Sequence, residues 1–505
     1  MKSIISLLRT FPRVVLAGIL AVSAAVPASA QRGTEEPRAP REFRGAWVTT
    51  LMNLDWPSRP GLSSEQQQRE LIAILDHAQE LNLNAIVLQV RSMGEAFYRS
   101  EHAPWSHFLT GEMGRAPSPA YDPLEFAVRE AHKRGLELHA WLNPYRVHNN
   151  VEAGGIGSTH ISRTNPDIVR RYANVLWLDP TETATRDHIM DVVLEVVRNY
   201  DIDGIQFDDY FYPWPRDGRD FPDDENWAAY RQRGGEMSRG DWRRRHVDEL
   251  IQRFYREVKA EDPSVKVGLS PFGIWRPDHP EGIAGVDQYE VLYADPKRWL
   301  NQGWLDYLAP QLYWSTDQER QSYPRLLAWW VSENPRNRHI WPGLATWKIT
   351  ENDWPVDEII RQIDTARRQR GSTGHIHFRY AWLLNNRKGI SSALKERTYS
   401  RPALVPPSPW LGSEAPSRPQ VALREGTEGG GHTLQIRSKE DEDLRLWALY
   451  TRERDGWHFR QVLPANPRNQ GTIRLPASGE RISHVAISAV DRLGNESEKA
   501  VYRLR

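Results

Sequence analysis

Residues 203–213, Asp-Gly-Ile-Gln-Phe-Asp-Asp-Tyr-Phe-Tyr-Pro, join a short apolar strand pattern to two neighbouring carboxylates and a run of aromatic side chains. The segment 204–207 is too short and too rich in β-favouring residues for a helix, and it follows a helical run that ends near Tyr200. We therefore expect Asp208 and Asp209 at the C-terminal end of a buried strand. In a barrel of parallel strands, that end carries the active site.

Carboxylates beside aromatic rings suit the cleavage of a glycosidic bond. One carboxylic acid protonates the glycosidic oxygen, and a second carboxylate stabilises or attacks the positive charge that develops on the sugar. Aromatic rings offer flat apolar faces on which pyranose rings stack. Such rings follow the pair at Tyr210, Phe211, Tyr212 and Trp214. The alternative is that one Asp only caps the next helix or orders the loop.

Strand-like and helix-like runs alternate along residues 41–399, which predicts an α/β fold, a (β/α)8 TIM barrel with long loops. Amphipathic runs such as 64–81 and 185–200 predict the helices. Residues 145–184 form a long insert after the third strand, with a further strand candidate at 175–178. The eight expected barrel strands are 43–50, 85–91, 137–143, 204–209, 266–270, 307–314, 340–346 and 375–380.

The N-terminus has the pattern of an export signal. Basic residues precede an apolar run at 14–22, and Ala28-Ser29-Ala30 supplies small residues of the kind a signal peptidase reads. We predict a signal peptide at 1–30 and a short N-terminal segment at 31–40, hence a periplasmic or secreted protein. The apolar run is shorter than the roughly 20 residues of a membrane-spanning helix. A lipid-modified cysteine anchor is excluded because the chain has no Cys.

The composition favours a large exported enzyme over a nucleic-acid-binding protein. The 66 basic residues balance 66 acidic residues, so no polyanionic partner is indicated. The absence of Cys excludes disulfides, a thiolate nucleophile and thiolate metal sites. The chain contains 21 Trp and 18 Tyr, the residue types that line carbohydrate-binding clefts. We expect a glycan as the partner and no cofactor, and the sequence does not predict an oligomeric state.

The C-terminal fifth of the chain predicts a second, smaller domain. Residues 400–418 are rich in Pro and read as a linker or a strap across the barrel. Residues 419–505 hold short strand candidates at the spacing of a β-sandwich. The segment 487–497 resembles the last hairpin of fibronectin type III modules. We expect this module to be separable, so that a chain ending near Ser417 folds on its own.

Seven segments between about residue 40 and residue 400 carry a resemblance to a known family. They are Arg44-Gly45-Ala46-Trp47-Val48, Gln89-Val90-Arg91, Gly94-Glu95-Ala96-Phe97-Tyr98, Trp141-Leu142-Asn143-Pro144-Tyr145-Arg146, residues 203–210, Ser270-Pro271-Phe272-Gly273 and Pro310-Gln311-Leu312-Tyr313-Trp314. Over this range the chain resembles glycosyl-hydrolase-like family 10. The resemblance implies a TIM-barrel glycosidase acting on bacterial envelope glycans, with at least one branch of the family cleaving peptidoglycan strands stripped of their stem peptides. This chain has Glu95 where the family usually has Asp.

These observations predict an exported glycoside hydrolase that cleaves bacterial envelope glycan, with peptide-free peptidoglycan strands as its substrate. One alternative is a catalytically silent barrel that only binds carbohydrate. Another is a hydrolase of a different extracellular polysaccharide. A third is a surface adhesion protein built around the C-terminal sandwich, which would not require polar side chains to gather at one end of the barrel.

The catalytic candidates are Asp208, Glu95 and Asp209. Because neighbouring side chains on a regular strand point to opposite faces, we expect Asp208 to face the barrel axis and Asp209 to point away. The second carboxylate then comes from another strand, first Glu95, whose neighbour Gly94 allows a tight loop, and next Asp295. The alternative for Glu95 is a structural ion pair with a neighbouring arginine.

The strand segment also resembles the Asp-rich signature of family 18 chitinases, in which the acid is a Glu two residues after the last Asp. In this chain that position is Tyr210. An N-acetyl-assisted mechanism of that type therefore lacks its usual proton donor.

A ring of polar and aromatic side chains near the predicted strand ends is expected to bind substrate. His139, Trp141 and Asn143 lie on one strand with the spacing of a single face, although a buried structural histidine is the alternative for His139. His139 with His375 and His377 would offer a zinc site, but no helical His-Glu spacing supports it, and we expect no metal. Arg146 and Arg276 either anchor substrate oxygens or brace carboxylates. The substrate-binding candidates are Trp47, Arg91, His139, Trp141, Asn143, Tyr210, Tyr212, Gln311, Tyr313 and Trp314.

Overall fold

A parallel sheet forms the centre of the computed structural model, which describes residues 36–425, 432–439, 443–466, 468–475 and 482–504. Its strands follow the order β10-β9-β8-β7-β3-β2-β1-β12-β11. All neighbouring pairs are parallel. The strands are β1 (Phe43–Val48), β2 (Ala85–Arg91), β3 (Glu137–Leu142), β7 (Gly204–Phe207), β8 (Lys266–Leu269), β9 (Tyr307–Leu308), β10 (His339–Ile340), β11 (Gly343–Ala345) and β12 (Gly374–Phe378).

The sheet closes on itself because β10 and β11 are two halves of one strand. Only Trp341 and Pro342 separate them, and proline has no N–H to continue a ladder. The first half pairs with β9 and the second with β12. Gln311 bridges to Gly343, which extends the β9 side onto the second half. Nine strands therefore occupy eight positions around a ring, and the predicted TIM barrel is confirmed.

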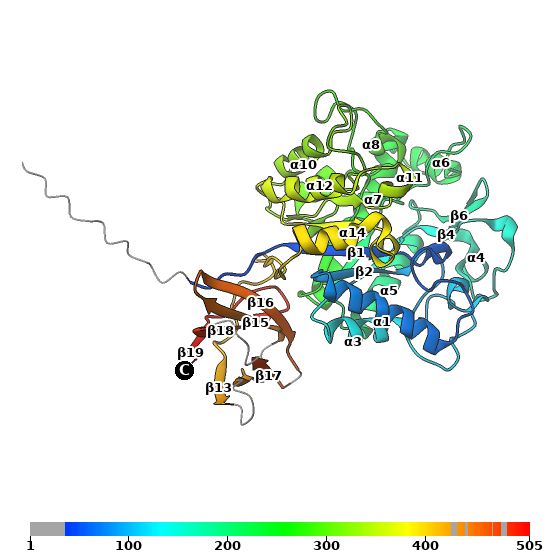
Figure 1. Cartoon of the computed structure of the whole chain (residues 1–505). Coiled ribbons are helices and arrows are strands. Elements are labelled where there is room, and N and C mark those ends of the chain that lie inside the picture. The colour runs from blue at the N-terminus through cyan, green and yellow to red at the C-terminus, as the bar shows by residue number, and fades with distance from the viewer. Residues whose placement is uncertain (1–35, 426–431, 440–442, 467, 476–481, 505) are drawn as a thin grey trace, which may run out of the picture. The chain divides into compact units, whose positions relative to one another are not determined.

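Helices surround the strands (Figure 1). Capping residues in the sequence explain where two of the helices begin. Ser63 and Gln66 form a reciprocal capping box, and Asp122 caps a helix with Pro at its first position. The unit after β8 has only short helices, within 288–302. The helices are α1 (Ser64–Glu80), α2 (His107–Thr110), α3 (Pro123–His132), α4 (Ile161–Thr164), α5 (Thr183–Asn199), α6 (Asp224–Gln232), α7 (Arg239–Glu261), α8 (Gln288–Val291), α9 (Pro296–Gln302), α10 (Tyr323–Ser332), α11 (Lys348–Glu351), α12 (Val356–Arg368), α13 (Tyr380–Leu384) and α14 (Ile390–Ala393).

The insert after β3 forms a small antiparallel sheet of its own. Its order is β4 (Arg146–His148), β6 (Val175–Leu178) and β5 (Val169–Tyr172). The strand expected at 175–178 is therefore confirmed. Because this sheet follows the C-terminal end of β3, it belongs to the same end of the barrel as Asp208.

Two separate apolar cores set the direction of every side chain on the strands. Phe43, Trp47, Trp141, Tyr307 and Trp341 pack together inside the barrel. A larger cluster, which includes residues such as Leu88, Ile205 and Phe207, fills the space between strands and helices. Since strand side chains alternate, Gly204 and Gln206 of β7 face the axis, and the next inward position is Asp208.

Two glycines make room for the large inward rings. A Cβ added at Gly268 would lie 1.9 Å from the Tyr307 ring, and one at Gly204 would lie 2.5 Å from the His139 ring. Both rings lie near the N-terminal strand ends, which we call the barrel floor. Side chains therefore fill the lower half of the barrel, and only the opposite end, the barrel mouth, is left to receive a ligand.

The C-terminal part consists of two antiparallel sheets that share one core. Leu434 and Ile436 from the first sheet pack with Trp447, Val485 and Ile487 from the second. This confirms the predicted all-β sandwich. The sheets are β13 (Gln420–Glu425), β14 (His432–Arg437) and β17 (Gln470–Leu475), and β16 (Gly456–Pro464), β15 (Leu444–Glu453), β18 (His484–Asp491) and β19 (Ala500–Arg503).

The Pro-rich segment before the sandwich lies against the barrel as a strap. Leu404 forms a bridge with Arg41, just ahead of β1. Val405 joins the cluster inside the barrel, and the Trp410 indole donates to the Asp306 carboxylate at 2.8 Å. The strap therefore closes the barrel floor, and the alternative of a free linker does not hold.

The sandwich also contacts the barrel floor. Lys266 is fully buried, and its ammonium group binds Glu137 Oε1 at 3.0 Å and the Arg492 carbonyl at 3.2 Å. The Arg492 guanidinium pairs with Asp201 of the barrel and with Asp443, at 3.1 Å, of the sandwich.

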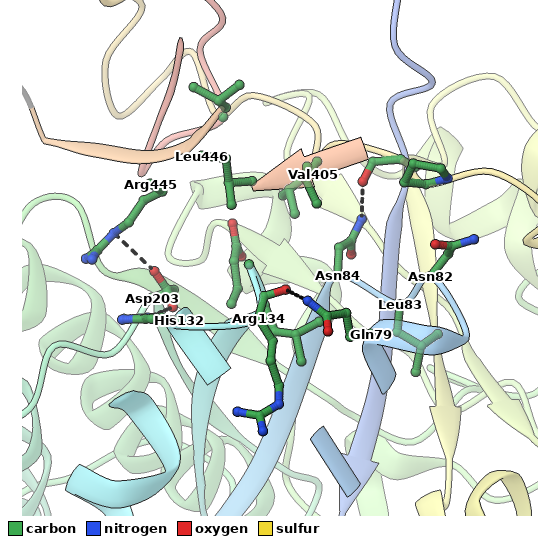
Figure 2. Close-up of a pocket in the computed structure, with 18 of the residues that line it drawn as sticks. Gln79, Asn82, Leu83, Asn84, His132, Arg134, Asp203, Val405, Arg445 and Leu446 are labelled. Atoms are coloured by element: carbon green, nitrogen blue, oxygen red, sulfur yellow. Dashed lines mark hydrogen bonds and ion pairs between the residues drawn. The ribbon is translucent and has the colours of Figure 1, made fainter. Parts of the chain in front are cut away.

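A cavity of about 250 Å³ is lined by Glu137 and Arg492 among others. Figure 2 shows part of its lining, including Asn84, Asp203 and Arg445. Asn84 and Asp203, which line it, directly precede β2 and β7, so the cavity is at the floor and not at the mouth. Its polar walls are already paired: Asn84 donates to the Ala403 carbonyl, and Asp203 binds His132. The cavity therefore offers a ligand few free polar groups.

Substitution of Arg492 tests how strongly the contacts between the sandwich and the barrel floor stabilise the protein. We expect Arg492→Ala to lower the free energy of unfolding by about 2 kcal/mol, because it removes a buried guanidinium that donates to the Ile202 carbonyl and pairs with Asp201 and Asp443. Urea unfolding followed by fluorescence measures the change. The matched control is Arg454→Ala on the exposed β15–β16 turn, which should change stability by less than about 0.5 kcal/mol. Unchanged stability of Arg492→Ala would support the separable module expected from the sequence.

Candidate active site

Asp208 lies at the barrel mouth, one residue beyond the end of β7. Its side chain is 4% exposed. The Trp141 indole N–H and the Asn143 amide donate to Asp208 Oδ2 at 3.1 and 3.2 Å. Both donors come from β3 or its end, as predicted for inward-facing residues. Asp208 Oδ1 is buried and has no hydrogen-bond partner among the residues that the structure describes.

Asp209 also belongs to the mouth, so the expectation that it points away is wrong. The regular strand ends at Phe207, and the alternation of side chains does not extend beyond it. The Asp209 carboxylate is 7% exposed and forms hydrogen bonds with the side chains of Gln311 and Trp214. Gln311 follows β9, two strands away from β7. The carboxylates of Asp208 and Asp209 thus lie side by side.

Burial and mutual repulsion change the acidity of the pair. Burial, and after it the charge of Asp209, raises the pKa of Asp208 to about 7. Burial also raises the pKa of Asp209, to about 6, against the hydrogen bonds from Gln311 and Trp214. Arg146 lowers both values. Near neutral pH the pair therefore holds a proton that two exposed aspartates would have lost.

Arg146 links the small inserted sheet to this pair. Its guanidinium lies 3.8 Å from the centre of the Tyr210 ring, and its backbone N–H donates to Asn143 Oδ1 at 3.0 Å. Asn143 therefore connects Arg146 to Asp208. Arg276, the other arginine considered from the sequence, instead pairs with Asp287 at 3.1 Å and braces a loop.

Half-buried aromatic rings continue around the mouth from Asp209. Phe272 packs edge-on against Trp214 and Trp314, each at 5.5 Å between ring centres. Tyr313 lies 4.7 Å from Trp347 and 5.8 Å from Phe378. These rings form an aromatic collar of Trp214, Phe272, Tyr313, Trp314, Trp347 and Phe378.

The structure brings Tyr313, Trp314 and Gln311 to the mouth as predicted. Three members of the collar, Phe272, Trp347 and Phe378, were missed as binding residues. Each lies at or within about three residues of a barrel strand end, and this position is the signal that would have identified them. Trp47 is buried beside Phe378 and supports the collar from inside the barrel.

Three predicted binding residues lie elsewhere. His139 faces the axis but lies on the floor, where Tyr307 and Glu137 bind its two ring nitrogens at 2.9 and 3.0 Å. Tyr212 is buried in the core against Tyr293 and Phe221 and presents no face to a sugar.

Arg91 is buried as well and donates to the Asn143 carbonyl at 2.9 Å, so it positions Asn143 rather than reaching a ligand. His375 and His377 both bind the Tyr399 hydroxyl, outside the barrel wall. They do not converge with His139, and the zinc alternative is excluded at this position.

The Glu95 carboxylate binds a histidine and does not face a ligand at the mouth. The side chain is completely buried, and its oxygens accept from the His107 backbone N–H at 2.6 Å and from His107 Nδ1 at 2.8 Å. Asp295 accepts from the Trp275 indole and caps α9. His107 thus binds both oxygens of Glu95, and the Trp275 indole and the Arg298 backbone N–H both donate to Asp295 Oδ1.

An open cavity of about 650 Å³ lies beside His107, between the loops that follow β1, β2 and β3. Its lining includes the half-exposed His107 ring, Met52 and His148. A second polar group of interest lies in the sandwich, where ligand atoms of Glu453, Asp455 and His458 approach within 4.8 Å of one another. Arg460 and His458 already pair with these two acids.

A closed parallel barrel with paired carboxylates in an aromatic mouth defines a TIM-barrel glycoside hydrolase. The glycosyl hydrolase-like 10 family matches residues 42–358, and the chain belongs to that family. It is 38% identical to the glycosyl hydrolase YngK of Bacillus subtilis (strain 168) over 479 residues, 91% of this chain and 92% of the relative. It is 35% identical to the glycosyl hydrolase DigH of Escherichia coli (strain K12) over 388 residues, 71% and 87% of the two chains.

Among solved structures, the chain is similar to the glycoside hydrolase domain of PgaB (BpsB) from Bordetella bronchiseptica, with a TM-score of 0.49, 16% identity and coverage of 70% of this chain and 98% of that domain. The predicted signal peptide lies outside the described residues. Within the described ranges, no helix is both long and apolar enough to cross a membrane.

The raised pKa values predict how stability depends on pH. A carboxyl group whose folded pKa exceeds its ordinary value of 3.8 binds its proton more tightly in the folded state. Stability is therefore lost as the pH rises from about 4 through about 7. We expect Asp208→Asn, which cannot ionise, to gain about 1 kcal/mol or more relative to the wild type between pH 5 and pH 8, measured by urea unfolding. The exposed Asp217→Asn is the control, and a parallel change in both variants would contradict the prediction.

Proposed function

We propose that this protein is an exported hydrolase of bacterial envelope glycan, acting on peptidoglycan strands that have lost their stem peptides. The observation that carries the proposal is the pair Asp208 and Asp209, buried side by side in an aromatic mouth. A carboxyl group with a pKa near 6 or 7 is still protonated where a general acid must act. Its neighbour supplies the negative charge that an oxocarbenium-like transition state requires.

The aromatic collar supports a glycan without peptides. Stacked rings recognise the flat C–H faces of bare pyranoses and offer few hydrogen-bond partners to a peptide. The open cavity beside His107 lies between loops that follow β1, β2 and β3, at the same end of the barrel as the pair, and gives room for further sugar units. The N-terminal pattern of residues 1–30 supports export to the compartment in which such strands occur.

We also infer that the barrel occupies residues 41–399, with 31–40 ahead of it and the strap at 400–418, and that residues 419–505 form a fibronectin type III-like module. A three-stranded sheet facing a four-stranded sheet supports this class of sandwich.

Substitutions of the carboxylate pair test the proposed roles. We expect Asp208→Asn and Asp209→Asn each to lower turnover at least about a hundredfold, a loss of roughly 3 kcal/mol in transition-state stabilisation, while the protein stays folded. The rate of reducing-end release from glycan strands measures this.

Asp295→Asn is the matched control for the same chemical change. Asparagine caps a helix as well as aspartate, so α9 should persist and turnover should change by less than about threefold. A second comparison is Glu95→Gln, which replaces one acceptor oxygen by an amide facing His107 and should reduce stability more than turnover. Loss of turnover in Asp295→Asn or in well-folded Glu95→Gln, with Asp208→Asn active, would transfer the catalytic role away from the pair.

The substrate is tested with purified sacculi before and after an amidase removes the stem peptides. We expect the mature protein to release sugar fragments, identified by mass spectrometry, from the amidase-treated strands and little from intact cross-linked sacculi. Equal release from both would contradict the preference for bare glycan. Release from starch-like glucans alone would assign another polysaccharide, and binding without any release would favour a silent carbohydrate-binding barrel.

A further inference from the structure

Asp208 and Asp209 approach a substrate from one side. They are consecutive residues, so their Cα atoms are about 3.8 Å apart at the end of a single strand. In a retaining glycosidase with a carboxylate nucleophile, the two carboxyl groups face each other across the sugar at about 5 Å, and in an inverting enzyme they are about 6.5–9.5 Å apart. Neighbouring side chains that leave the same strand end do not enclose a pyranose ring in this way.

Neither of the two other carboxylates expected from the sequence, Glu95 and Asp295, takes the opposite side. Glu95 is enclosed with His107, and Asp295 caps α9. With these two carboxylates held by other groups, a nucleophile carried by the substrate itself fits the arrangement. A sugar that carries a 2-acetamido group brings one of its own, the carbonyl oxygen of that group.

The oxygen Oδ1 of Asp208 can accept a hydrogen bond from the N–H of an acetamido group. Trp141 and Asn143 both donate to Oδ2, and they hold the carboxylate in one orientation. Oδ1 is buried and finds no partner in the described part of the chain, which is unfavourable unless a bound ligand supplies a donor. An amide N–H is such a donor, and an acceptor at this position directs the amide carbonyl oxygen back towards the anomeric carbon.

We propose that the 2-acetamido group of the substrate is the nucleophile, that Asp208 Oδ1 accepts its N–H, and that Asp209 is the general acid. This inference rests on the proposed function and adds the substrate class: the sugar whose glycosidic bond is cut must carry an N-acyl amide at C2.

The reaction balances without a further reactant except water. The N–H that the substrate donates to Asp208 Oδ1 favours the charge of the pair on Asp208 and its proton on Asp209. Asp209 transfers that proton to the glycosidic oxygen as the bond from that oxygen to C1 breaks, and the acetamido oxygen forms a new bond to C1. The resulting oxazolinium ion carries a positive charge, which the Asp208 carboxylate stabilises through the N–H. Water then attacks C1, and Asp209 accepts a proton from that water. The oxazolinium ring opens, which restores the acetamide. Two displacements leave the configuration at C1 unchanged.

The ending of β7 explains why this chemistry was not visible in the sequence. In the family 18 pattern, the acid is two residues after the last Asp, so that both side chains face one side of a regular strand. In this chain the strand ends at Phe207, and the very next residue, Asp209, reaches the mouth. Tyr210 at the position of the family 18 acid therefore does not remove the proton donor.

A series of N-acyl groups on one glycan tests the inference with the full-length mature protein. Amidase-treated strands are chemically N-deacetylated and then re-acylated with acetyl, fluoroacetyl, difluoroacetyl or trifluoroacetyl groups. Fluorine withdraws electrons from the amide oxygen, so kcat should fall stepwise, by about a hundredfold or more over the series, while KM changes much less. The re-acetylated sample controls for damage by the chemistry.

Two further measurements make the outcome decisive. The anomeric configuration of the first product, followed by NMR, should equal that of the substrate. Equal kcat across the acyl series, rapid cleavage of the deacetylated strands, or an inverted product would overturn acetamido participation and leave a hydrolase in place. Failure to cut even the re-acetylated strands would instead overturn the proposed function on this substrate.

Discussion

The repulsion between two carboxylates crowded at the end of β7 is the constraint on which the mouth depends. In the described part of the chain, neither Asp208 nor Asp209 forms an ion pair, and both are nearly buried. The surrounding groups oppose this cost with dipoles: an indole and an amide on Asp208, an amide and an indole on Asp209. Neutral donors stabilise negative charge without removing the raised pKa that proton transfer requires.

At the floor of the barrel, in contrast to the mouth, buried charges are paired with opposite charges. Lys266 pairs with Glu137, which also binds His139, and Asp203 pairs with His132. The strap and the sandwich then cover these groups. Charges at the floor are thus matched with partners and enclosed, which favours stability, whereas the mouth keeps its acids unpaired. Proteins depart from full pairing of buried charge mainly at functional sites.

The sequence predicted most of what depends on periodicity. Strand runs, capping residues and turns identified the eight barrel positions and the sandwich, because alternation and helix caps are local properties. The inward direction of Asp208, Trp141 and Asn143 followed from the same alternation. The residue at which a strand ends could not be predicted. Asp209 was placed on the wrong face because β7 ends at Phe207, and the alternation of side chains stops there.

Depth along the barrel axis was the other limit of the sequence. His139 and Asn143 share a face, yet four residues of strand separate them by roughly 13 Å. That distance separates a floor residue bound to Tyr307 from a mouth residue bound to Asp208. The alternation of a sequence pattern shows which face of a strand a residue occupies. It does not show the height of that residue along the barrel axis, because this height depends on the stagger between neighbouring strands. A residue can therefore be assigned to the axis from sequence, but its assignment to floor or mouth requires the register of its neighbours.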